Sequence, residues 1–279
     1  MADPRITPAR GDIAARHLEG QVTAERFVDG EPRVVIDPIA PLRLQPQSGA
    51  ELATQALKGE RVTIYDRNGE GWAWGQLERD FYVGWLPEAA LATPTAAPTH
   101  KISALRSFAF PGPSIKLPPV ETLLMGAAVA VVRDEASFVV TADGWFVPKR
   151  HVAGLDHAEP DYVAVAERFV GTPYLWGGKS SLGIDCSGLV QVSLNAAGVA
   201  CPRDSDMQLA SLGRALDEAE PPRRGDLIFW KGHVAIVRDA DTIVHANAFH
   251  MATQFEPIAE AIVRIKASGS DVLAIKRLD

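Results

Sequence analysis

Cys186 stands at the predicted start of a helix, directly after Asp185 and before Ser187. The unpaired N–H groups and the dipole of a helix N-terminus favour a thiolate, the reactive form of cysteine, and can lower the pKa of the thiol below its free value of about 8.5. Burial as a small apolar residue is an equally ordinary use of a free cysteine. The position therefore predicts a nucleophile only if a base lies nearby.

Two histidines could supply that base. His233 precedes the apolar run 234–237, and His245 ends the next apolar run, 242–245. An antiparallel hairpin through 238–241 would bring the two imidazoles close together. A thiol, a general base and a group that orients the base form a nucleophilic catalytic set. Either histidine alone is usually a structural polar residue, but the three residues together indicate catalysis.

Metal or phosphate binding would be another use of these residue types. The chain has two cysteines, Cys186 and Cys201, and neither lies in a C-x-x-C pattern. No H-E-x-x-H pattern occurs, so we expect no metal site. Gly178-Lys179-Ser180 imitates the end of a phosphate loop, but the leading glycine of that loop would fall at Pro173. Cys201 has no partner histidine in the pattern, and we expect it to be buried and inert.

The elements that position these residues change character along the chain. From Asp161 onward, apolar residues follow helical spacing as far as 171–173, and a second helix is predicted over 186–197 with Gly198 past its end. Strand-like runs follow at 227–230, 234–237, 242–245 and 272–275. Helices followed by antiparallel strands predict an α+β domain over 156–279.

The first half of the chain is predicted to be all β. Short alternating apolar runs between 20 and 92, with a hairpin turn at 66–69, indicate a small β-barrel. A stretch rich in proline, threonine and alanine at 92–98 is typical of a linker. Two weak echoes, 57–62 with 124–129 and 84–87 with 144–148, predict a second small barrel. The expected domains are therefore 1–97, 98–155 and 156–279.

Composition limits the partners. The chain has 279 residues, 47% of them hydrophobic, with 28 Lys and Arg against 35 Asp and Glu for a net charge of −7. These values are typical of globular proteins, and the mild acidity without a basic run argues against nucleic acid or an anionic membrane as partner. Residues 1–5 show no signal-peptide pattern, so we expect a cytoplasmic protein, or a periplasmic or extracellular one if a leader has been removed. The sequence does not indicate an oligomeric state.

Five successive segments resemble the motifs of the NlpC-type cell-wall cysteine peptidases. They are YLWGG at 174–178, IDCSGLVQ at 184–191, RGDLIF at 224–229, GHVAI at 232–236 and IVHA at 243–246. The upstream modules resemble bacterial SH3-like domains, by weaker motifs such as YVGWLP at 82–87. The three-part layout is similar to that of the γ-D-glutamyl-L-diamino acid endopeptidases.

The resemblance implies a papain-like α+β catalytic domain in which Cys186 is the nucleophile, His233 the general base and His245 the residue that orients the base. It also implies a cleft lined by six further residues: Tyr174, Trp176, Asp185, Ser187, Asp204 and Ser205. In relatives with this layout the first SH3-like domain walls off one end of the cleft. Glu51, Tyr82 and Asp204 could then bind the ammonium group of a free N-terminal L-alanine.

The implied reaction is hydrolysis of the γ-D-glutamyl-diamino acid bond in murein tripeptides or tetrapeptides, releasing L-Ala-γ-D-Glu without a metal or organic cofactor. Two alternatives stay open. The domain could be an amidase or acyltransferase acting on another amide, or the chain could be a non-catalytic wall-binding adaptor. The preferred diamino acid cannot be derived from the residues.

Overall fold

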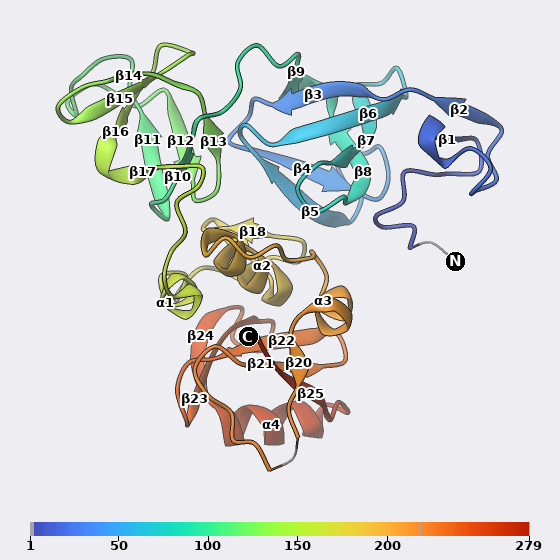
Figure 1. The fold of residues 1–279 in the computed structure, drawn as a ribbon, viewed down its shortest axis with the longest axis vertical. Coiled ribbons are helices and arrows are strands. Elements are labelled where there is room, and N and C mark those ends of the chain that lie inside the picture. The colour runs from blue at the N-terminus through green and yellow to red at the C-terminus, as the bar shows by residue number, and fades with distance from the viewer. Residues whose placement is uncertain (1–2, 218, 279) are drawn as a thin grey trace. The chain divides into compact units, whose positions relative to one another are not determined.

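The computed structural model describes residues 3–217 and 219–278, and the chain divides into two compact units, Met1–Leu155 and Asp156–Asp279. We call them the N-terminal unit and the C-terminal unit. The N-terminal unit consists of strands and short 3-10 turns, whereas the C-terminal unit combines helices with strands (Figure 1). Within the described residues, no helix has both the length and the apolar character needed to cross a membrane.

The first β-module of the N-terminal unit is an antiparallel sheet with the strand order β5-β4-β8-β7-β6-β3-β9. Its strands are β3 (Glu31–Val35), β4 (Ile39–Arg43), β5 (Leu52–Leu57), β6 (Arg61–Arg67), β7 (Trp72–Leu77), β8 (Val83–Pro87) and β9 (Leu91–Ala92). A parallel pair, β1 (Ile13–Ala15) and β2 (Arg26–Val28), and the 3-10 turn Arg16–Leu18 precede it. Alternate residues such as Val62 and Ile64 point into its apolar core.

The expected hairpin turn at 66–69 is misplaced by two residues. A register shift between Ile64 and Asp66 extends β6 to Arg67, so the turn falls at 68–71. There the Asn68 side-chain oxygen accepts the N–H groups of Glu70 at 2.8 Å and Trp72 at 3.1 Å. This side-chain turn sets the position of the hairpin, and alternation of apolar residues cannot reveal it.

The second β-module contains three small sheets, with the orders β13-β10-β17, β11-β12 and β14-β15-β16. Its strands are β10 (His100–Ile102), β11 (Arg106–Ala109), β12 (Glu121–Leu124), β13 (Ala128–Val129), β14 (Val131–Asp134), β15 (Phe138–Thr141), β16 (Phe146–Pro148) and β17 (Val152–Gly154). Leu57 of the first module is buried in the core of the second, among Leu124, Ala127 and Val139. The two modules therefore share apolar packing.

The two sequence echoes correspond to repeated local structure. Gly59 after β5 and Gly126 after β12 both have positive φ, +80° and +89°. Each of β8 and β16 ends in a proline that leads into a 3-10 turn, Glu88–Ala90 and Lys149–His151, and then into a short strand. The same local solution thus recurs in both modules, as the echoes predict.

The C-terminal unit is built on a six-stranded antiparallel sheet with the order β20-β25-β21-β22-β23-β24. Its strands are β20 (Arg214–Ala215), β21 (Leu227–Trp230), β22 (His233–Val237), β23 (Thr242–Asn247), β24 (Ala252–Pro257) and β25 (Val272–Arg277), with the separate pair β18 (Lys179–Ser180) and β19 (Gly183–Ile184). Its helices are α1 (Tyr162–Glu167), α2 (Cys186–Ala196), α3 (Ser205–Ser211) and α4 (Ile258–Ala267). This mixture confirms the α+β prediction.

Helices cover both faces of the sheet (Figure 1). Ile228, Ala235 and Ile243 point toward α4 and form one core cluster with Ala261 of that helix. Neighbouring strand residues that alternate with them, such as Val234 and Val244, are also fully buried. They lie on the opposite face, where α2 packs against β22 and β23.

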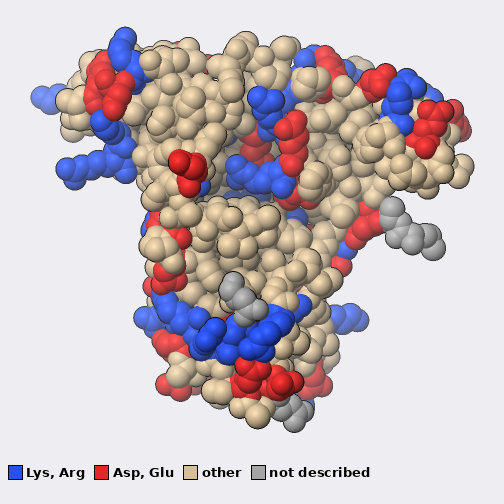
Figure 2. Space-filling model, in the orientation of Figure 1, with Lys and Arg blue, Asp and Glu red and all other residues tan. Residues whose placement is uncertain are grey.

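Charged side chains of both signs lie next to one another on the face shown in Figure 2. In the C-terminal unit, Arg224 pairs with Asp161 at 2.7 Å and with Glu167 at 3.1 Å. Arg214 and Glu220 pair at 2.8 Å. Exposed pairs of this kind contribute little to stability, because water screens both charges.

Candidate active site

Cys186 is the first residue of α2, as the sequence predicts. Asp185 is the N-cap, and its carboxylate accepts the N–H of Gly188 at 2.7 Å. A Cβ atom on Gly188 would lie 2.3 Å from the carbonyl oxygen of Gly178, so glycine is required for the helix to start this close to the 173–178 loop. The local sequence therefore places the thiol at a helix N-terminus held tightly against a loop.

The carboxylate of Asp185 is also part of a buried ion pair with Arg203. The two Arg203 side-chain nitrogens lie 2.9 and 2.7 Å from the two Asp185 oxygens. Arg203 is 1% exposed and Asp185 7% exposed. Gly177 donates its backbone N–H to the same carboxylate at 2.8 Å. Asp185 thus anchors the start of α2, and its contact with a substrate stays a prediction.

The pKa of the Cys186 thiol is raised, to about 12. Burial is the largest cause, the charge of Asp185 adds to it, and backbone N–H groups of Val234 and Ser187 oppose it. The expectation of a lowered thiol pKa is therefore wrong. Removal of the thiol from water outweighs the helix N-terminus, so the resting group is a neutral thiol.

His233 and His245 face one another across the hairpin that the sequence predicts. Nε2 of His233 lies 3.0 Å from Nδ1 of His245, and the ring centroids are 5.2 Å apart. Trp230 packs on the His233 ring with centroids 5.6 Å apart. Burial lowers the pKa of His233 to about 3 and that of His245 to about 4, so both rings are neutral at pH 7.

The thiol and the histidine pair belong to one site. Val234 directly follows His233 in β22, and its backbone N–H contacts the Cys186 sulfur. The second nitrogen of His233 is not used in the contact with His245. A neutral imidazole beside a thiol can accept its proton, and a partner on the far nitrogen fixes the ring.

Tyr174 and Trp176 lie on the loop between α1 and β18. Tyr174 is half-buried, and its pKa is raised by burial and then by the nearby Cys186 and Asp185, which places the ring close to the thiol. Trp176 is 59% exposed. Tyr174 thus lies beside the site and Trp176 is open to solvent, and the contact of either with a substrate stays a prediction.

Three other predicted cleft residues lie close to Arg203. The Ser187 hydroxyl is buried and accepts a hydrogen bond from Arg203 at 2.9 Å. Asp204 is the N-cap residue of α3 and Ser205 begins that helix, both of them partly exposed. Ser187 thus completes the anchor of α2, while Asp204 and Ser205 present surface at the start of α3.

Glu51 and Tyr82 belong to the N-terminal unit, whereas the residues above belong to the C-terminal unit. Glu51 is exposed and directly precedes β5. Tyr82 is 5% exposed and packs in the core of the first β-module with Leu42 and Leu77. Trp85 belongs to a separate apolar cluster with Trp74. A substrate contact for Glu51 or Tyr82 stays a prediction.

The two cysteines have separate roles. Cys201 is buried and reduced, as is Cys186. The Cys201 carbonyl oxygen accepts a hydrogen bond of 3.2 Å from the side-chain amide of Gln191 in α2. The expectation that Cys201 is buried is confirmed, and its lack of reactivity stays a prediction.

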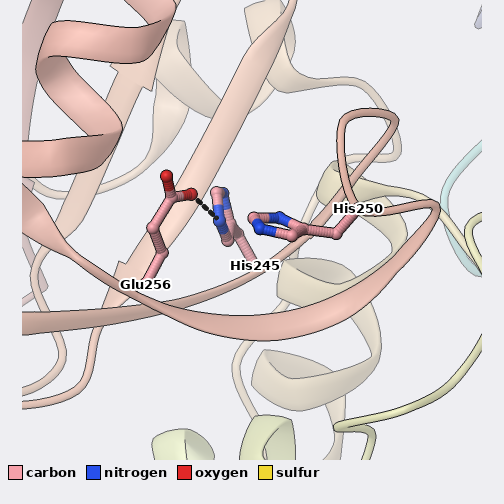
Figure 3. Close-up of side chains that lie close together, drawn as sticks. All are labelled: His245, His250 and Glu256. Carbon is pink, nitrogen blue, oxygen red and sulfur yellow. Dashed lines mark hydrogen bonds and ion pairs between the residues drawn. The ribbon is translucent and has the colours of Figure 1, made fainter.

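One group of possible metal ligands lies beside the histidine pair. Ligand atoms of His245, His250 and Glu256 lie within 4.8 Å of one another (Figure 3). Arg264, however, donates to both Glu256 oxygens, at 2.9 and 2.7 Å. A cation would have to displace this guanidinium, so the group fits a hydrogen-bond chain better than a metal site.

Sequence reasoning missed Arg203, Glu256 and Arg264. Arg203 follows Pro202 in a segment without helical or strand period, so no pattern points to its burial. Glu256 and Arg264 lie in β24 and α4, neither of which was predicted. For Arg203 the sequence offers one weak signal of a role, which is that a charged residue lies between two predicted elements.

Comparison with known proteins extends the picture. Residues 42–91 match the bacterial dipeptidyl-peptidase SH3 domain and residues 171–266 match the NlpC/P60 family. The γ-D-glutamyl-L-lysine dipeptidyl-peptidase of Bacillus cereus is 28% identical over 242 residues, 75% of this chain and 71% of that protein. Dipeptidyl-peptidase 6 of Lysinibacillus sphaericus is 28% identical over 240 residues, 77% of this chain and 87% of that protein.

Among solved structures, an NlpC/P60 family protein from Bacillus cereus superposes with a TM-score of 0.76 at 21% sequence identity. The match covers 88% of this chain and 99% of that one. At this identity the likeness concerns the fold, and it agrees with the predicted papain-like catalytic domain behind an SH3-like region.

Proposed function

Starting from the NlpC/P60 domain that the chain carries behind a bacterial dipeptidyl-peptidase SH3 domain, we propose that it is a cysteine endopeptidase of murein stem peptides. It hydrolyses the γ-D-glutamyl-diamino acid bond of tripeptides or tetrapeptides and releases L-Ala-γ-D-Glu. The names of the Bacillus cereus and Lysinibacillus sphaericus relatives, both dipeptidyl-peptidases, support removal of an N-terminal dipeptide.

The observation that carries the proposal is the joint placement of Cys186, His233 and His245. The thiol begins α2, the strand that starts at His233 contacts it through Val234, and Nδ1 of His245 lies 3.0 Å from Nε2 of His233. This placement supports a site that combines a nucleophile, a base and a residue that holds the base. An adaptor without catalytic function would not require this set.

The chemistry proceeds in two halves. The Cys186 sulfur attacks the γ-glutamyl carbonyl while its proton passes to His233, and backbone N–H groups at the start of α2 hold the oxyanion. The tetrahedral adduct collapses to a thioester as His233 protonates the departing amine of the diamino acid. Water then attacks the thioester with His233 as base, which releases L-Ala-γ-D-Glu and restores the thiol.

Specificity for a free N-terminal alanine is the second part of the proposal. Glu51, Tyr82 and Asp204 are the residues assigned to the ammonium group, through opposite charge and hydrogen bonding. Such an enzyme suits the recycling of short muropeptides in the cytoplasm of a bacterium. The same reaction would serve wall turnover outside the membrane.

The test is a mass-spectrometric assay of the purified chain on L-Ala-γ-D-Glu-meso-diaminopimelate and on the corresponding L-lysine peptide. We expect L-Ala-γ-D-Glu as a product, no cleavage by Cys186→Ala, and retained cleavage by Cys201→Ala, which removes a buried thiol outside the site. Acetylation of the peptide N-terminus should abolish turnover.

Three outcomes would contradict the proposal. No cleavage of either peptide would remove the function, and unchanged cleavage by Cys186→Ala would remove the nucleophile. Equal cleavage of free and acetylated peptides would favour a less specific amidase and leave Glu51, Tyr82 and Asp204 without the proposed role.

A further inference from the structure

The hydrogen bonds of the histidine pair continue beyond His245. Nε2 of His245 lies 2.9 Å from Oε2 of Glu256, a residue of β24 that is 7% exposed (Figure 3). Arg264 of α4 binds both oxygens of that carboxylate. The guanidinium of Arg264 also stacks on the Phe249 ring, 4.5 Å from its centroid. Glu256 is therefore held in one orientation between His245 and Arg264.

The chemistry of these groups fixes where the protons lie. Burial raises the pKa of Glu256, but hydrogen bonds and the charge of Arg264, together with His245, hold it below its ordinary value. An ionised carboxylate only accepts hydrogen bonds, so Nε2 of His245 must be the donor to Glu256. In a neutral imidazole the other nitrogen is then an acceptor.

The same reasoning extends to the next ring. Nδ1 of His245 carries a lone pair, so Nε2 of His233 must donate across the 3.0 Å contact. Nδ1 of His233 is then left without a proton. This is the protonation state that a general base needs.

We propose that Glu256, held by Arg264, is a positioning residue that sets the tautomers of both histidines and leaves Nδ1 of His233 as the proton acceptor. The inference rests on the proposed peptidase function, in which His233 accepts the thiol proton. Glu256 acts through His245 and is assigned no contact with the substrate. His250 also lies beside His245. Its Nδ1 lies 3.0 Å from Asn247, and it is not part of the series of hydrogen bonds that runs from Glu256 to His233.

Removing the acceptor removes the bias on the tautomers. In Glu256→Leu the carboxylate that accepts from Nε2 of His245 is gone, so His245 can carry its proton on Nδ1. Nε2 of His233 then becomes the acceptor, and His233 carries its own proton on Nδ1. In that state Nδ1 of His233 cannot accept a proton. In Glu256→Gln the amide keeps one acceptor oxygen but loses the charge that favours one arrangement. The effect should therefore be graded from Gln to Leu.

The chain contains a close control. Asp226 is buried and is bound by Arg277 through both oxygens, at 2.9 and 2.7 Å, and no histidine takes part in these two hydrogen bonds. Asp226→Asn therefore perturbs a buried ion pair of the same kind in the same unit. A loss of activity that arises only from weakened folding should appear in this variant too.

The experiment combines kinetics with NMR of the full chain labelled with 15N-histidine. Removing the partner that orients a metal-binding histidine costs roughly 10- to 100-fold, and we take the same range for Glu256. We expect kcat for stem-peptide cleavage to fall by that factor in Glu256→Leu, less in Glu256→Gln, with KM within about twofold of wild type. Asp226→Asn should keep its kcat. Long-range 1H–15N spectra should show His245 protonated at Nε2 in wild type and a changed pattern in Glu256→Leu.

The proposal is overturned if folded Glu256→Leu keeps the wild-type kcat and the wild-type tautomers, or if Asp226→Asn loses as much activity. The NMR measurement needs no substrate. If wild type cleaves no stem peptide but the tautomers still depend on Glu256, the proposed function fails and the positioning role stands.

Discussion

Breaking the buried ion pair between Asp185 and Arg203 should destabilise the start of α2 far more than breaking an exposed ion pair would. In Arg203→Met the arginine stem is replaced by a side chain of similar length, and the Asp185 carboxylate loses both of its guanidinium contacts. Asp185 keeps the N–H groups of Gly177 and Gly188. The remaining donors reduce the damage but do not neutralise the charge.

The burial of both Asp185 and Arg203 determines how large the free-energy cost of Arg203→Met is. Removing one partner of a buried ion pair typically costs 3–5 kcal/mol, because the other charge stays in a poorly solvating environment. The two N–H donors place this case at the lower end, about 3 kcal/mol, which is roughly a 150-fold change in the opening equilibrium at 1.4 kcal/mol per tenfold. The exposed pair Arg168–Glu159 provides the comparison, since Arg168→Met should cost about 1 kcal/mol or less.

Hydrogen exchange of the α2 backbone amides, measured by mass spectrometry on the full chain, reports this opening locally. We expect exchange through opening to become roughly 150-fold faster in Arg203→Met. The double variant Asp185→Asn/Arg203→Met, which keeps a cap acceptor and removes the stranded charge, should recover most of the protection. A change below about tenfold in the single variant, or no recovery in the double variant, would refute the reasoning.

Three further predictions concern the histidine pair and the thiol. Because the folded-state pKa values of His233 and His245 lie below 6.5, at about 3 and 4, the free energy of unfolding should be flat in pH above 6.5 from these groups and fall below it by about 1.4 kcal/mol per pH unit for each histidine. Urea titrations between pH 7.5 and 5 check this, and His233→Asn should roughly halve the slope. Because burial raises the pKa of Cys186, its iodoacetamide alkylation rate in a Cys201→Ser background should still be rising at about pH 9; a plateau near pH 6 would show a lowered pKa instead. Since Arg264 occupies Glu256, chelation of divalent metals should leave peptide cleavage unchanged within about twofold, and a loss restored by zinc would contradict that assignment.

The parts of the fold that sequence predicts are those with a strong local pattern. The helix that begins at Cys186 and the hairpin of the two histidines follow from the apolar period and the turn residues. By contrast β24 escaped prediction because its residues Ala252–Pro257 mix polar and apolar types, and their pairing with β23 is determined by tertiary contacts. The helix α4 was missed together with it.

The site divides in the same way. Residue type and order point to Cys186, His233 and His245. In the structure Nε2 of His233 lies 3.0 Å from Nδ1 of His245. The thiol pKa could not be derived, because desolvation depends on how completely neighbouring elements cover the sulfur. Arg203 was invisible for a related reason, since only the folded chain shows that its charge is buried against Asp185.

Leu57 and Gly59 connect the two β-modules in a way that restricts how such genes can be recombined. Leu57 fills the core of the second module, and a Cβ atom on Gly59 would lie 2.1 Å from the Ala128 carbonyl oxygen. A crossover in the 92–98 segment would separate the two modules and expose the apolar surface that each hides from water. A crossover between Leu155 and Asp156 falls at the border of the compact units and leaves that shared packing whole. The two β-modules should therefore be exchanged between chains of this layout together, as one segment.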